Sequence, residues 1–134
     1  MIDQILATAL TCMAQTAYME SRSEDILAQV SVIQVLWRRA NHNPRNVCIE
    51  MKKPYQFSWY AKIEPPSPWS VELRPYYLLA NQVIKSQLPD YSKGATNFHD
   101  TSIHKPVTWK VAFVAQYSHL IFYRQEETKY AQRF

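Results

Sequence analysis

The chain has 134 residues, of which 47% are hydrophobic and 19% charged, a composition that is typical of an ordinary globular domain and not of a disordered chain. Its length fits one domain, residues 1–134, with enough apolar surface to fold without staples. The formal net charge of +4 favours anionic partners, but the 15 Lys and Arg residues are scattered, which argues against a nucleic-acid-binding protein.

Residues 2–19 are apolar or small on almost every side, which is typical of a central, buried helix. No apolar run reaches the length of a membrane span, and the start of the chain lacks the basic region of a signal peptide. We therefore expect synthesis in the cytoplasm and no stable membrane insertion. Cys12 and Cys48 match neither a disulfide scaffold nor a zinc motif; a disulfide between them stays open, and reduced thiols are favoured.

A polar break at residues 20–25 separates this first helix from a second, amphipathic one. Ser23 is the expected N-cap of the second helix, and Pro44 closes it. A short helix is expected at residues 47–51. Residues 52–70 carry four prolines among five aromatic residues, which indicates an irregular loop of functional length.

The pattern changes after a last helix, expected at residues 71–87. Short strands are predicted at residues 96–99 and 120–123, while residues 111–114 are ambiguous between strand and helix. The single glycine, Gly94, precedes the first strand and is expected to supply a positive φ angle or a close backbone approach. The chain is therefore predicted to be α+β, mainly helical with a small C-terminal antiparallel sheet.

Glu20 is the sharpest candidate for chemistry because it ends the apolar helix at the edge of the core. Burial disfavours a charged carboxylate and raises its pKa, and a carboxylic acid that stays protonated near neutral pH can protonate a glycosidic oxygen. The structural alternative is a helix-end residue that pairs with Arg22 or faces water, and taken alone this is the commoner role.

Two further segments could bind a ligand. Residues 55–60 combine aromatic rings, which stack on sugars, with Gln and Ser side chains for hydroxyl and acetamido groups, although the rings could equally cover the core. In the first strand, alternation places Thr96 and Phe98 on one face and Asn97 and His99 on the other, facing either a cleft or solvent. The four histidines match no metal-ligand spacing.

Seven short motifs run in order over about residues 5–124 and together resemble the cell wall hydrolase domain of the spore-cortex-lytic enzyme SleB, a domain also found in phage endolysins. The chain departs from the family pattern at Ser23, which replaces a glycine, at Asn97, which replaces a histidine, and at Asp100, which replaces a small residue. The motifs are Glu20-Ser21-Arg22-Ser23-Glu24, Val35-Leu36-Trp37-Arg38, Pro44-Arg45-Asn46-Val47-Cys48, Gln56-Phe57-Ser58-Trp59, Gly94-Ala95-Thr96-Asn97-Phe98-His99, Pro106 to Trp109, and His119-Leu120-Ile121-Phe122-Tyr123-Arg124.

The resemblance implies a lysozyme-like or lytic-transglycosylase-like fold and cleavage of peptidoglycan between N-acetylmuramic acid and N-acetylglucosamine, with Glu20 as the catalytic acid. Neither a metal nor another cofactor is expected. The side chains expected to contact the substrate are Tyr18, Gln56, Ser58, Trp59, Asn97, His99, Trp109 and Tyr123.

These observations favour a glycosidase of the lytic transglycosylase type, a monomeric phage endolysin that reaches the wall from the periplasm with a holin-like membrane partner and causes cytolysis. A hydrolytic muramidase, in which Glu24, Asp100 or Glu64 orients a water molecule, is the first alternative. A metal-dependent wall amidase or peptidase that uses the histidines and a non-catalytic binding protein are the others.

Overall fold

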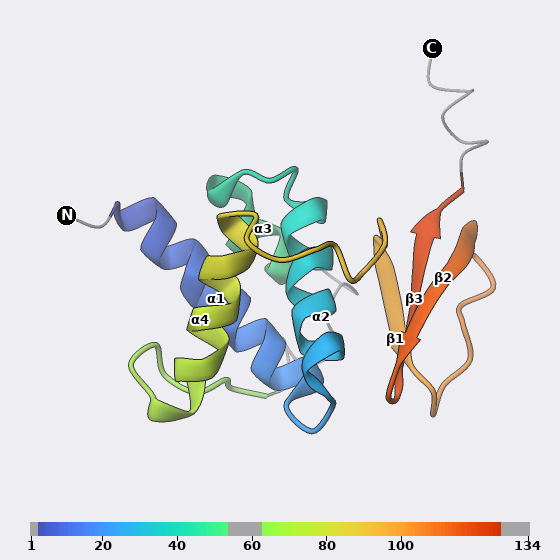
Figure 1. Cartoon of the computed structure of the whole chain (residues 1–134), viewed down its shortest axis with the longest axis horizontal. Coiled ribbons are helices and arrows are strands. Elements are labelled where there is room, and N and C mark those ends of the chain that lie inside the picture. The colour runs from blue at the N-terminus through green and yellow to red at the C-terminus, as the bar shows by residue number, and fades with distance from the viewer. Residues whose placement is uncertain (1–2, 54–62, 127–134) are drawn as a thin grey trace, which may run out of the picture.

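The computed structural model describes residues 3–53 and 63–126, and Figure 1 shows helices grouped on one side and a small sheet on the other. This arrangement confirms the mainly helical α+β class. The described elements are α1 (Gln4–Ser21), α2 (Ile26–Arg39), α3 (Pro44–Lys52), a 3-10 helix (Val71–Leu73), α4 (Arg74–Ile84), β1 (Asn97–Asp100), β2 (Val111–Tyr117) and β3 (Leu120–Gln125).

Side-chain caps decide where the helices begin. The Asp25 carboxylate accepts a hydrogen bond from the backbone N–H of Ala28, so Asp25 rather than Ser23 is the N-cap of α2. The expectation for Ser23 was wrong because a cap two residues further on reaches the free N–H groups of the first turn. Pro44 follows the end of α2 as expected, and it is also the first residue of α3, capped by Asn43.

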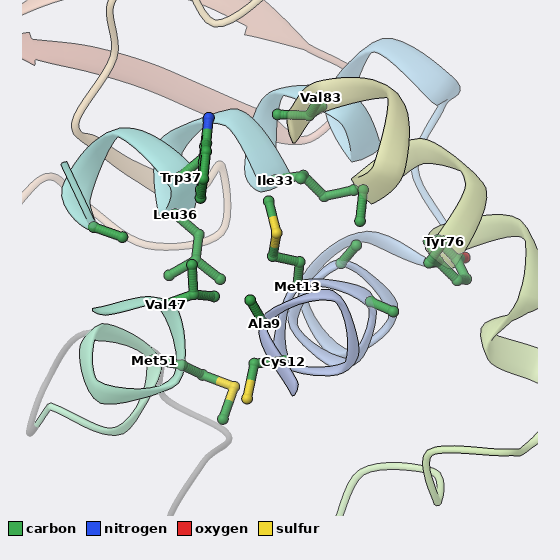
Figure 2. Close-up of a cluster of buried hydrophobic side chains, with 14 of the residues drawn as sticks. Ala9, Cys12, Met13, Ile33, Leu36, Trp37, Val47, Met51, Tyr76 and Val83 are labelled. Atoms are coloured by element: carbon green, nitrogen blue, oxygen red, sulfur yellow. The ribbon is translucent and has the colours of Figure 1, made fainter. Parts of the chain in front are cut away.

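Helix α1 lies against α2, α3 and α4, and this confirms that the N-terminal helix is central. Its buried side chains meet side chains of the three surrounding helices in one apolar cluster, shown in Figure 2. The largest members of the cluster are fully buried, so truncating one of them would leave a cavity. They include Met13 of α1, Ile33 and Leu36 of α2, and Val47 of α3.

A disulfide between Cys12 and Cys48 joins α1 to α3, with 5.5 Å between the two Cα atoms. The preference for reduced thiols was therefore wrong. The two cysteines are 36 positions apart in the chain, and only the side-by-side packing of the two helices brings them within bonding distance.

The three strands form an antiparallel sheet in the order β1-β3-β2. One face of the sheet packs against α2, where Phe122 and Leu120 lie on Val32 and Val35. Figure 1 shows the sheet beside α2, with the β2–β3 turn at the same end of the molecule as the α1–α2 turn. The ambiguous residues 111–114 belong to β2.

The approach to β1 depends on the single glycine and on the end of α2. Gly94 has a φ angle of +82°, as expected, and its N–H donates to the Asp90 carboxylate. Arg38 at the end of α2 donates to Asp90, to the Ser92 hydroxyl and to the backbone carbonyl of Ala95. These bonds hold the loop before β1 against α2 and so set where β1 begins.

Candidate active site

The outer face of the sheet collects side chains that the sequence pattern predicted to contact a substrate. Asn97 and His99 of β1 lie on one face of the strand, and Phe98 between them lies on the other face and packs on the core. Asn97 pairs with Tyr123 of β3 in the strand register, so these residues share one face. The predicted alternation of the first strand is confirmed.

His99 and Tyr123 are locked together. Nδ1 of His99 lies 2.8 Å from the backbone carbonyl oxygen of Asp100, which can only accept, so Nδ1 carries the hydrogen. In the neutral ring Nε2 then accepts a hydrogen bond from the Tyr123 hydroxyl, 2.8 Å away. Burial raises the pKa of Tyr123 above its usual 10.0, which keeps that hydroxyl protonated.

Two more rings extend this pair into an aromatic face, which we define as His99, Trp109, Phe113 and Tyr123. The ring centroids of Trp109 and Phe113 lie 6.0 Å and 6.4 Å from that of Tyr123, both nearly perpendicular to it. Sequence analysis missed Phe113, which is 61% exposed. A bulge between Phe113 and Ala115 sets its direction, and no periodic pattern predicts a bulge.

Glu20 lies at a different place, in the last turn of α1, where it is half-buried. The neighbouring Tyr18 packs edge-on against Tyr76 of α4, with 6.0 Å between ring centroids. The guanidinium of Arg22 lies 4.7 Å above the Tyr18 ring, and its Nη1 donates to the Tyr18 carbonyl at the end of the helix. One face of the Tyr18 ring is therefore covered by Arg22.

Glu24 connects the Glu20 end of the helices to the sheet. Its carboxylate accepts a 2.7 Å hydrogen bond from the backbone N–H of His119 in the β2–β3 turn, and Nδ1 of His119 lies 3.3 Å away. Burial would raise the pKa of Glu24, but the hydrogen bonds and the charge from His119 lower it below its ordinary 4.5. Glu24 is therefore ionised at neutral pH.

Asp100, at the other end of β1, is also held in its charged form. A 2.8 Å hydrogen bond from the backbone N–H of Ser102 lowers the pKa of the Asp100 carboxyl below 3.8. Two of the three carboxylates considered for orienting a water molecule, Glu24 and Asp100, thus bind backbone N–H groups.

The structure brings together four of the predicted substrate contacts, Asn97, His99, Trp109 and Tyr123, and it places Tyr18 and Glu20 at the end of α1. Gln56, Ser58 and Trp59 lie outside the described residues. Within residues 3–53 and 63–126, no group of three His, Cys, Asp or Glu side chains is gathered as a metal site.

The fold and the site thus define the protein as a mainly helical α+β domain that carries the aromatic face on its sheet. Its particular family is given by comparison, because residues 23–123 match the family described as Cell Wall Hydrolase. The chain belongs to this family, and the resemblance to SleB-type hydrolases is confirmed. It is therefore a peptidoglycan-degrading enzyme.

The matched segment includes the aromatic face and Glu24, whereas Tyr18 and Glu20 come before it. No curated protein and no solved structure gives a significant match to the chain. None of the helices in the described part is both long and apolar enough to cross a membrane.

Proposed function

We propose that the protein cleaves the glycan strands of peptidoglycan between N-acetylmuramic acid and N-acetylglucosamine, with Glu20 as the acid and base. The observation that carries this proposal is the half-buried place of Glu20 in the last turn of α1. Glu20 is also the first residue of the segment Glu20-Ser21-Arg22-Ser23-Glu24, in which the resemblance to the family assigns the acid to the first glutamate. The glycosidic oxygen must be protonated as it leaves, and only a neutral carboxylic acid can donate that proton.

In this mechanism the Glu20 carboxyl donates its proton to the glycosidic oxygen, and the bond from that oxygen to C1 of the muramic sugar breaks. The N-acetylglucosamine side leaves with a free 4-hydroxyl. The 6-hydroxyl oxygen of the same muramic sugar then bonds to C1 and gives its proton to the Glu20 carboxylate. No water is consumed, and the product carries a 1,6-anhydro end.

The surroundings of Glu24 and Asp100 support this single-carboxylate route. A hydrolytic enzyme needs a second carboxylate to orient a water molecule or stabilise the sugar cation. The Glu24 carboxylate binds His119, and that of Asp100 binds Ser102, so each already has a structural partner. Hydrolysis remains the second candidate, and the ends of the products distinguish the two.

The proposed substrate contacts divide between the two places. The rings of Trp109 and Tyr123 would stack on sugar faces, and Asn97 would bind hydroxyl or acetamido groups. We also propose that Tyr18 lies beside the reacting sugars. The same role proposed for Gln56, Ser58 and Trp59 belongs to the loop outside the described residues.

The biological setting follows from the resemblance to phage endolysins and is part of the proposal. The protein would act as a monomer on the wall from the periplasm and cause cytolysis after a holin-like partner permeabilises the membrane. Expression with and without such a membrane protein, followed by culture turbidity, tests this. Lysis without any permeabilising partner would contradict the delivery step.

The first experiment is digestion of purified peptidoglycan by the wild type and by Glu20→Gln, with the products read by mass spectrometry. We expect Glu20→Gln to lower the rate at least about a hundredfold, because the amide cannot donate the proton. Glu72→Gln, which changes an exposed carboxyl in the 3-10 helix, is the matched control and keeps full activity.

The product ends then name the reaction. An anhydro end is lighter than a reducing end by one water. If only reducing ends were found, the protein would be a hydrolase and not a transglycosylase. Undiminished activity of a folded Glu20→Gln protein would remove Glu20 from the mechanism. Activity that a chelator abolishes would favour a metal-dependent amidase or peptidase instead.

A further inference from the structure

A pocket of about 420 Å³ opens where the last turn of α2 meets the sheet, at the opposite end of α2 from Glu20. Its volume lies in the range of sites that hold small ligands. Side chains from α2, from the start of β1 and from the segment before β2 line it. They include Arg38, Arg39, Asn97, Trp109, Lys110 and Gln125.

The pocket and its immediate surroundings carry an excess of positive charge. Glu50 also lines the pocket, and its carboxylate forms salt bridges with both Arg39, at 3.1 Å, and Lys53, at 2.8 Å. Arg38 pairs with Asp90. Lys110 is exposed and forms no salt bridge within the described part of the chain. Among the residues that line the pocket, three are cationic, Arg38, Arg39 and Lys110, and one is a carboxylate, Glu50, which leaves net positive charge for a ligand.

Arg39 is held in place with donor capacity left over. Its Nε donates to Glu50 and its Nη1 donates to the backbone carbonyl of Thr96. Its Nη2 donates to no acceptor in residues 3–53 and 63–126. A guanidinium that its neighbours already orient loses little conformational entropy when it binds a carboxylate.

The pocket continues the aromatic face, because Trp109 belongs to both and Asn97 lies beside Tyr123. It is also remote from the proposed reaction. Glu20 precedes the turn into α2, and the 14 residues of α2 extend about 20 Å along the helix axis between the two places. A group that binds in the pocket must therefore belong to a part of the substrate that extends well away from the bond being cut.

We propose that this pocket binds free carboxylates of the stem peptide that peptidoglycan carries on its muramic acid. The inference rests on the glycan-cleaving function proposed above. N-acetylated sugars are uncharged and gain little from a cationic pocket, whereas stem peptides carry free carboxylates. An extended peptide covers about 3.3–3.6 Å per residue, so five residues span about 17 Å, close to the length of α2.

The test compares two substrates, purified soluble glycan strands that keep their stem peptides and the same strands after an amidase has removed them. The release of new chain ends gives KM and kcat for the wild type, for Lys110→Glu, and for Lys85→Glu as a control with the same charge change at the end of α4. We expect Lys110→Glu to raise KM about tenfold on stem-bearing strands alone, the scale of one charge-assisted hydrogen bond. Its kcat stays unchanged.

Other outcomes are distinct. An equal rise in KM on both substrates would mean that the pocket binds sugar, and no rise on either would mean that it binds no substrate; both overturn the proposal. If the wild type cleaves neither substrate, the glycan-cleaving function fails. Titration of the wild type with free stem peptide, followed by Trp fluorescence, then decides: binding that Lys110→Glu weakens supports the pocket, and no binding overturns it.

Discussion

At the scale of single residues, the pair of His99 and Tyr123 decides how the aromatic face is built. The two rings are stacked with centroids 5.4 Å apart, and the Tyr123 hydroxyl donates to a histidine that is only 8% exposed. Lys105 adds a positive charge 6.0 Å from the Tyr123 ring. The hydroxyl of Tyr123 therefore serves structure, and its half-buried ring packs against His99, Trp109 and Phe113.

Substitutions at Tyr123 separate these two roles. We expect Tyr123→Phe to lower the free energy of unfolding by about 1–3 kcal/mol, because it leaves the buried Nε2 of His99 without its partner. Its KM for peptidoglycan strands stays close to that of the wild type, whereas Tyr123→Ala raises KM. Urea unfolding and steady-state kinetics measure both quantities, and a large rise in KM for Tyr123→Phe would assign the hydroxyl to the substrate.

At the scale of elements, the disulfide between Cys12 and Cys48 fastens the central helix α1 to α3. Helix α3 is only nine residues long, so its stability depends on packing rather than on its own hydrogen bonds. Val47 and Met51 supply that packing from one side of α3. The disulfide restricts the unfolded chain by closing a loop, and this stabilises the folded protein in addition to the packing of α3.

Reduction should therefore destabilise the folded protein. With the cysteines 36 positions apart in the chain, we expect a reducing agent to lower the free energy of unfolding by about 2–4 kcal/mol. The double variant Cys12→Ser with Cys48→Ser should match the reduced wild type and show no response to the reagent. Identical urea midpoints for the oxidised and reduced wild type would contradict a stabilising role.

At the scale of the whole molecule, ionised carboxylates join parts of the chain that lie far apart in sequence. Glu24 binds the β2–β3 turn, and Asp90 binds Arg38 of α2. Burial acts to raise the pKa of each carboxyl. The hydrogen bonds from His119 lower the pKa of Glu24 by more than burial raises it. Ser92, Arg38 and Gly94 have the same net effect on the pKa of Asp90.

This direction sets the pH dependence of stability. A carboxyl whose pKa is lower in the folded protein stabilises the fold above its unfolded pKa and loses that contribution as pH falls through the folded value. The loss begins near 4.5 for Glu24 and near 3.8 for Asp90. We expect Glu24→Gln to be less stable than the wild type at pH 7 and to lose less on acidification. Parallel stability curves from pH 7 to pH 3 would disprove this.

Local patterns were sufficient for much of the fold because they depend on neighbours along the chain. The uniformly apolar N-terminal segment predicted the central helix, and alternation predicted that Asn97 and His99 lie on the opposite face of the strand from Phe98. The single glycine predicted the positive φ angle before β1. Short-range periodicity and the φ preference of Gly94 are physical properties that a sequence displays directly.

Other features arise only when distant segments pack together. The Cys12–Cys48 disulfide, the bond from His119 to Glu24 and the bulge that directs Phe113 each depend on elements that are not adjacent in the chain. The sequence pattern also could not predict that Asp25 rather than Ser23 caps α2. Both residue types cap helices well, and the path of the turn decides between them. Periodicity carries no information on such pairings, so only the tertiary structure could settle them.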